Sequence, residues 1–158
     1  MVRKSNNACL NQFTEHQNSL FMDNATEVDV TFVAGTTGAL GAHTILTVTG
    51  TVAMQLFAVC STNLAGAGAT IEVGSATTTT GMIAQTTATN IDANEIWHDN
   101  APDSSIESTT ILSTSLSQIK IVHEDIIYTV GTAAISGGVL KFIVRWAPIS
   151  ADGNVVLA

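Results

Sequence analysis

The stretch 94–103, NEIWHDNAPD, holds a glutamate, a histidine and two aspartates in a chain that is otherwise poor in charge. Glu95, His98 and Asp99 are spaced i, i+3, i+4, which would place them on one face of a helix. Carboxylate and imidazole groups so grouped can bind a cation, yet the order differs from HExxH and the acids lack the spacing of an EF-hand loop. We therefore predict no metal site, and the candidate ligands are Glu95, His98, Asp99 and Asp103.

A second interpretation treats the same stretch as a polar loop at an interface. Pro102 and the asparagines around it oppose a continuous helix. The large side chain of Trp97 would then pack against the protein's own core or against a neighbouring chain. In this interpretation Trp97, His98 and Asp99 form an interface loop.

The rest of the sequence lacks the patterns of a catalytic site. There is no GxSxG elbow, and the glycine-rich stretches GTTGALG and LAGAGAT have neither the lysine nor the following helix of a phosphate-binding loop. His43 and His123 lie in turn-like contexts. Cys9 and Cys60 have no cationic neighbours, so both are expected to be free, unreactive thiols. We expect a protein that is not an enzyme and has no cofactor.

Charge and composition limit the partners. Of the 158 residues 46% are apolar and 11% are charged, against roughly 25% charged in ordinary domains. Thirteen acidic and five basic residues give a net charge of −8, which argues against nucleic acid or an anionic membrane as partner. No apolar run approaches the ~20 residues of a membrane helix, and the N-terminus does not resemble a signal peptide. We expect a protein that is made and used without export.

Alternating apolar residues predict β-strands from residue 27 onward. The clearest case is HTILTVTGTVAMQLFAVCS, in which even-numbered positions carry apolar side chains: Leu46, Val48, Val52, Met54, Leu56, Ala58 and Cys60. A single strand over 44–61 would be about 60 Å long, several times the usual length. We therefore expect a hairpin or a sharp bulge at Thr49-Gly50.

The last long element, GVLKFIVRWAP, alternates in the same way and ends at Pro148. Its polar face carries Lys141 and Arg145, which either contact a carboxylate-rich partner or are ordinary solvated side chains. Shorter strands are expected at 28–33, 70–75, 81–86, 106–112, 117–122 and 126–131. This pattern predicts an all-β fold, an antiparallel β-sandwich or jelly-roll-like barrel of about eight strands.

Residues 1–26 differ from this domain, which spans 27–158. They are rich in Asn and Gln, and four large apolar side chains fall near one face if 9–22 is helical: Leu10, Phe13, Leu20 and Phe21. Both a short helix and an extended arm fit this spacing. We expect an N-terminal arm that packs on a partner or on a neighbouring subunit.

Residues 35–158 resemble small virion proteins of tailed bacteriophages. The stretches that carry the resemblance are GALGAHTILTVTG, TIEVG, MIAQTTATNIDANEIWHD, DIIYTVGTA and FIVRWAPISADGNVV. Such proteins are commonly capsid decoration, or cement, proteins that trimerise over junctions of the major capsid protein. The resemblance thus implies a homotrimer on the capsid surface of a virion, made in the host cytoplasm, with the major capsid protein as partner. It brings no catalytic residues and does not extend to the arm.

The alternative is a receptor- or glycan-binding module of a tail fibre or spike. In that case Trp97, His98, Asp99 and Asp103 would form a sugar-binding loop. The small number of aromatic residues expected at the surface argues against this function.

Overall fold

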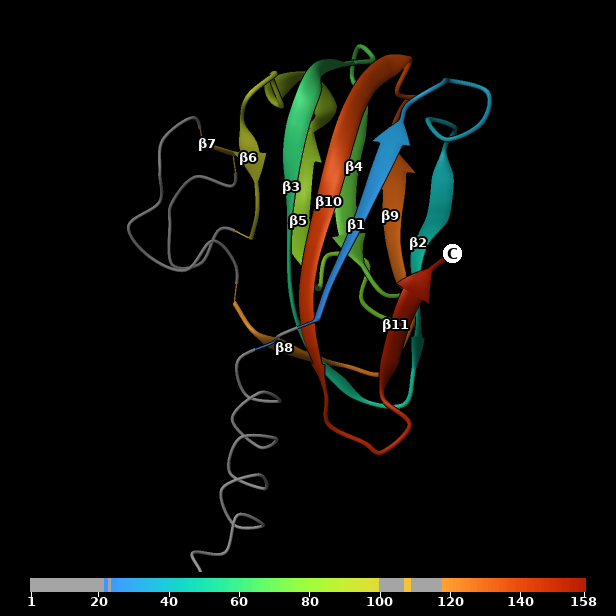
Figure 1. Ribbon diagram of the computed structural model, residues 1–158. Coiled ribbons are helices and arrows are strands. Elements are labelled where there is room, and N and C mark those ends of the chain that lie inside the picture. Colours follow the sequence, from blue (N-terminus) through green and yellow to red (C-terminus); the bar gives the residue numbers. More distant parts are fainter. Residues whose placement is uncertain (1–21, 23, 100–106, 109–117) are drawn as a thin grey trace, which may run out of the picture.

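Two antiparallel sheets pack face to face in this protein, as Figure 1 shows. The computed structural model describes residues 22, 24–99, 107–108 and 118–158. Sheet A has the strand order β1-β10-β3-β6-β7, and β8 also pairs with β3; sheet B has the order β11-β2-β9-β4-β5. The fold is therefore the predicted all-β sandwich of two separate sheets rather than a closed barrel.

The strands are short, apart from β3 and β10. Sheet A contains β1 (Asn24–Thr31), β3 (Val52–Ala65), β6 (Ile96–Trp97), β7 (Glu107–Ser108), β8 (Lys120–Val122) and β10 (Gly137–Pro148). Sheet B contains β2 (Gly41–Thr49), β4 (Thr70–Gly74), β5 (Ile83–Thr87), β9 (Ile126–Gly131) and β11 (Asn154–Leu157). A single 3-10 turn, η1 (Ala88–Asn90), follows β5. The described residues thus form eleven strands, against about eight expected, and the short β6 and β11 lie outside every range expected to be a strand.

Alternation along β3 and β10 builds the core, as the sequence predicted. Leu140, Phe142, Val144 and Trp146 of β10 are buried, and so are Val52, Met54, Leu56, Ala58 and Cys60 of β3. The intervening residues face outward from sheet A. The two strands pair over almost their whole length, and their inward side chains meet those of sheet B in one core cluster.

The break at Gly50 is confirmed, but the expected hairpin is wrong. β2 lies in sheet B and β3 in sheet A, so the chain passes from one sheet to the other between them. Gly50 adopts φ +62°, a left-handed conformation that suits glycine. β3 buries alternate residues, whereas β2 buries the neighbours Ile45 and Leu46 next to a bulge, and neither pattern shows whether two strands pair or cross over.

The first described strand begins before residue 27, where the β domain was expected to start. β1 begins at Asn24, and Met22 is buried at 5% exposure. The arm residues Leu10, Phe13, Leu20 and Phe21 lie outside the described residues, so the docking of the arm stays a prediction. Among the described residues, no helix is long and apolar enough to span a membrane.

Candidate functional site

The described residues of the NEIWHDNAPD stretch begin in a turn at Asn94 and continue into a strand, and none of them is helical. Ile96 and Trp97 form β6, which pairs with Ala58 and Val59 of β3. Extended backbone separates the side chains that a helix would have brought together. Glu95 instead accepts a hydrogen bond from the backbone N–H of Asp92 at 2.9 Å, within its own turn.

Trp97 is a core residue and not a surface anchor. Its side chain is 0% exposed, its ring packs edge-on against Phe142, and its indole N–H donates to the hydroxyl of Thr86. His98 is 1% exposed and Asp99 is 5% exposed. All three side chains are buried within the chain, so Trp97 packs on the protein's own core, the first of the two expected possibilities, and a role of this loop at an interface stays a prediction. A sugar-stacking role for Trp97 loses its physical basis for the same reason.

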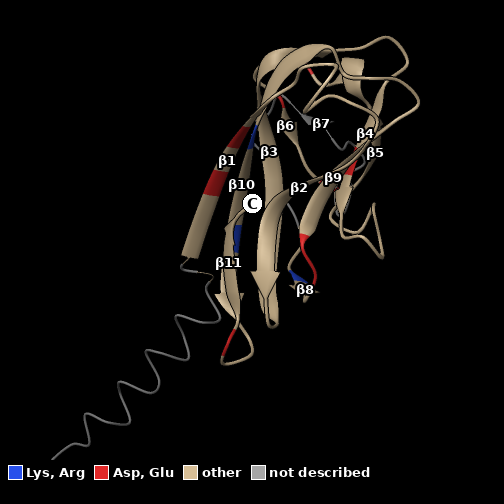
Figure 2. Ribbon diagram, turned by 90° about the vertical axis from the view of Figure 1, so that its right-hand side faces the viewer, with Lys and Arg blue, Asp and Glu red and all other residues tan. Residues whose placement is uncertain are grey.

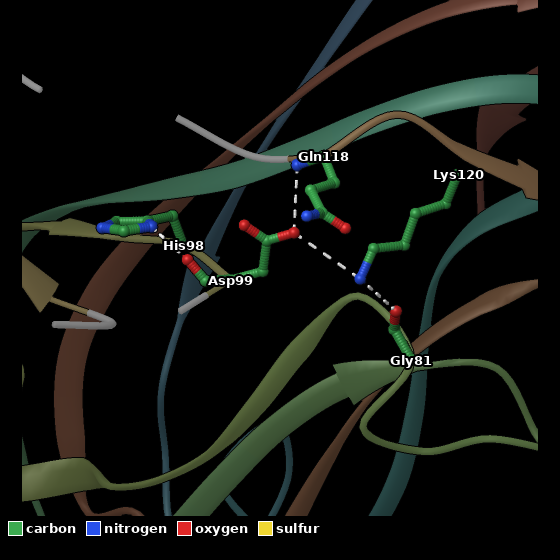
Figure 3. A network of polar contacts seen from close by, with 5 residues as sticks. All are labelled: Gly81, His98, Asp99, Gln118 and Lys120. Atoms are coloured by element: carbon green, nitrogen blue, oxygen red, sulfur yellow. Dashed lines mark hydrogen bonds and ion pairs between the residues drawn. The ribbon is translucent and has the colours of Figure 1, made fainter. Parts of the chain in front are cut away.

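Asp99, which is itself buried, is the centre of a polar network, shown in Figure 3. One of its carboxylate oxygens, Oδ2, accepts from the backbone N–H of Gln118 at 3.0 Å and lies 3.5 Å from the Lys120 ammonium. Lys120 also donates to the carbonyl oxygen of Gly81 at 2.8 Å. The network therefore ties the end of β6 to the start of β8 and to the β4–β5 loop.

Two atoms of this region lack hydrogen-bond partners among the described residues: Nε2 of His98 and Oδ1 of Asp99. They do not converge, because the imidazole and the carboxylate extend in different directions (Figure 3). Nδ1 of His98 contacts the carbonyl oxygen of Asp99. No group of three metal-binding side chains forms within the described residues, and Asp103 lies outside them.

The outer face of sheet A is the second candidate region. Phe57 of β3 and Ile143 of β10 are register partners that both point outward and are partly exposed, and Ile121 of β8 is 60% exposed. Here we use the name outer face of sheet A for the outward side chains of β1, β10, β3 and β8. Its centre is apolar.

Charged residues border this apolar centre. The Lys141 ammonium lies 3.3 Å from the Glu27 carboxylate, a contact between β10 and β1. Arg145 is exposed on the same face. Figure 2 shows acidic residues on β1 beside basic residues on β10. Lys141 thus has an acidic partner within its own chain, and contact of Lys141 and Arg145 with another protein stays a prediction.

A cavity of about 390 Å³ is the third candidate region. It lies between the β4–β5 loop and the segment from β8 to the start of β9, at the end of the sandwich where Figure 1 labels β8. Its polar lining includes Thr77, Thr78, Lys120, His123 and Glu124. From the sequence His123 has only the context of a turn histidine, and no local pattern marks the other four residues, because only the fold brings the two loops together.

Thr77 and Glu124 join the two walls of this cavity. The Thr77 hydroxyl donates to Glu124 Oε1 at 2.7 Å, and its backbone N–H donates to Oε2 at 3.2 Å. The hydrogen bond from the Thr77 hydroxyl is the main cause of a lowered pKa at Glu124, with further bonds from Ser75 and from the Thr77 backbone. A carboxylate at this position is therefore ionised at neutral pH.

Searches with this chain find no matching family model, no matching curated protein and no matching solved structure.

Proposed function

We propose that the chain is a non-enzymatic virion structural protein of a tailed bacteriophage, a capsid decoration protein. It assembles as a homotrimer on the capsid surface and stabilises the lattice of the major capsid protein. The observation that carries the proposal is the apolar centre of the outer face of sheet A, where Phe57 and Ile143 lie side by side. Apolar side chains gathered on a surface favour contact with another protein.

The edge of sheet A supports the same kind of contact. β1 pairs with β10 through eight consecutive residues, and the series continues where the Phe32 N–H donates to Gly138 O at 2.9 Å. Hydrogen-bonded residues alternate in an antiparallel pair, so the backbone groups of Ala25, Glu27 and Asp29 point away from β10. Within the described residues nothing pairs with this edge. An open edge of this length can bind a strand of another protein.

The mechanism is cooperative retention of weak contacts. A capsid under pressure from its DNA fails where its subunits separate. A decoration oligomer that holds several subunits at once must detach from all of them together, which multiplies the weak individual contacts. The low charge of the chain suits such contacts, because few ionic groups must be desolvated.

Copy number in purified particles tests the proposal. Quantitative mass spectrometry of virions should find this chain in an amount comparable with that of the major capsid protein. A tail fibre or spike module, the alternative function, would be present in only a few copies per virion. Absence of the chain from virions would refute both functions. Light scattering of the purified protein should give the mass of a trimer, and a stable monomer would contradict the oligomer.

A pair of matched variants tests the surface itself. Ile143→Lys places a charge in the apolar centre of the outer face of sheet A and should abolish capsid binding while the fold is retained. Val156→Lys is the control, since Val156 is 48% exposed on β11 of the other sheet. Equal binding by both variants would exclude the outer face of sheet A as the contact surface.

Truncation tests the arm. Because Met22 is buried and β1 begins at Asn24, the truncation should remove only residues 1–20. The shortened chain should fold and should no longer bind the capsid. Undiminished binding would show that Leu10, Phe13 and Leu20 are not the contact residues.

A further inference from the structure

The cavity between the β4–β5 loop and the β8–β9 segment has a size and a lining that the capsid proposal does not use. Its volume of about 390 Å³ lies in the range of small-molecule sites, roughly 300–1,000 Å³. All of its lining residues belong to the described part of the chain.

The walls of this cavity are held in place before any ligand binds. Two polar bridges cross between them, from Thr77 to Glu124 and from Lys120 to the carbonyl of Gly81. The β4–β5 loop is also closed on itself, because the N–H groups of Ser75 and Gly81 both donate to the carbonyl oxygen of Thr78 at 3.0 Å. A preformed site loses little conformational entropy on binding.

The polar groups of the cavity offer both donors and acceptors. Glu124 contributes a carboxylate, which only accepts hydrogen bonds, and Lys120 contributes an ammonium, which only donates them. The Lys120 ammonium has three N–H bonds, and two partners are found for it among the described residues, Gly81 and Asp99. The Thr78 hydroxyl can do both.

Charge and apolar surface narrow the ligand class. The cavity lining carries one cation, Lys120, and one anion, Glu124, and the Lys120 ammonium also lies 3.5 Å from Asp99, so no cluster of like charges marks the cavity as an ion site. Met82, Val122 and Ile126 supply an apolar lining. A ligand that fits both parts carries many hydroxyl groups and also C–H surface, as a pyranose sugar does.

We propose that this cavity binds a neutral carbohydrate of one or two pyranose units, through Glu124, Lys120 and Thr78. The site does not depend on a role in capsid decoration. It is also a different site from the sugar-binding loop considered at Trp97, whose side chain is buried.

Nuclear magnetic resonance titration tests the site with defined probes. The methyl α-glycosides of glucose, galactose and mannose, together with N-acetylglucosamine, are added separately to the full-length protein. At least one of them should shift backbone amide signals of 77–81 and 120–124 and leave the remaining signals in place. Glucuronic acid and glucosamine are the charged comparisons, and both should bind more weakly than the neutral sugar.

Two neighbouring acids provide matched variants. Glu124→Gln removes a charge that lines the cavity, and Asp125→Asn removes the same charge one residue away, where the Asp125 carboxylate accepts from the Val48 N–H at 2.9 Å. Both variants should fold, because each amide keeps one oxygen acceptor; Glu124→Gln gives up only the longer bond from the Thr77 N–H, at 3.2 Å. Glu124→Gln should weaken sugar binding by about tenfold, as expected for a hydrogen bond to a charged group. Asp125→Asn should not change it.

Four results would overturn the proposal: no shifts with any neutral sugar, shifts confined to another region, tighter binding of the charged sugars, or equal binding by Glu124→Gln and Asp125→Asn. None of these results would affect the capsid proposal, which is tested on virions.

Discussion

The indole N–H of Trp97 donates a hydrogen bond of 2.9 Å to the hydroxyl of Thr86, and this bond joins β6 of sheet A to β5 of sheet B. Both residues are buried, at 0% and 5% exposure. The polar atom of the largest core side chain is thus satisfied by the opposite sheet. The contact explains why a tryptophan can lie inside the sandwich.

Replacement of Thr86 by valine should destabilise the protein. Thr86→Val keeps the shape of the side chain and leaves the indole N–H buried without a partner, at a cost of about 1–3 kcal/mol in the free energy of unfolding. Urea denaturation followed by tryptophan fluorescence measures this loss. Thr87→Val is the control, because Thr87 is exposed on the same strand. Equal stability of the two variants would show that the hydrogen bond between Trp97 and Thr86 does not contribute to the free energy of unfolding.

Gly50 should not tolerate a side chain. A Cβ atom there would collide with the side-chain oxygens of Ser150 and Asp152, and φ is +62°. Gly50→Ala should therefore lower the free energy of unfolding by an amount on the order of 1–3 kcal/mol. Gly35→Ala, where nothing lies within 4 Å of the added atom, should change it by less than about 0.5 kcal/mol. Thermal denaturation of the two variants, compared with the parent, would reveal the difference.

The two ion pairs should differ in strength. Asp99 is buried, with 7% of its side chain exposed beside Lys120, whereas the side chains of Lys141 and Glu27 are 41% and 56% exposed. Lys120→Met leaves a buried carboxylate without its cation and should cost about 2–3 kcal/mol, less than in a fully buried pair because Lys120 is itself 30% exposed. Lys141→Met should cost less than about 1 kcal/mol. Chemical denaturation at low and high salt separates the two effects, and similar losses would contradict the assigned burial.

Tyr128 should ionise at a higher pH than a solvent-exposed tyrosine. Burial raises the pKa of its phenol to about 12, and the hydroxyl donates to the carbonyl oxygen of Thr37 at 2.6 Å. The folded state thus favours the neutral phenol. This contribution to stability is complete below the ordinary pKa of 10.0 and is lost as pH rises from 10 toward 12.

This ionisation can be followed directly, because the chain contains a single tyrosine. Ultraviolet absorbance should show tyrosinate appearing near pH 12 in the folded protein. In concentrated denaturant the same group should ionise near its ordinary value. A transition near pH 10 in the folded protein would mean that the phenol is open to solvent.

The alternation of the sequence was sufficient to predict the sheets but not their connections. The buried residues of β3 and β10 are those predicted from the apolar residues at every second position, since burial of one face is a local property of a strand. The crossing at Gly50 was mistaken for a hairpin because the turn itself has the same glycine signal in both cases. The short strands β6 and β11 were missed, since a segment of two to four residues has too few positions to show a period.

For the candidate site residues too, the local spacing in the sequence did not predict which side chains meet in the fold. The spacing of Glu95, His98 and Asp99 suggested a helical face, whereas pairing of β6 with β3 extends the backbone there and buries Trp97. The cavity residues Thr77 and Glu124 are 47 positions apart and carry no common motif. Their contact depends on how two loops meet at one end of the sandwich.

By itself the sequence determined that this protein is all-β with a weakly charged surface, because alternation and composition act through each residue's own preference for water or for the core. Tertiary structure alone decided which strands pair, that the two sheets form a sandwich, that the tryptophan of the NEIWHDNAPD stretch packs on the protein's own core, and that a cavity forms beneath the β4–β5 loop. These features depend on contacts between residues distant in the sequence, and no local pattern encodes such contacts.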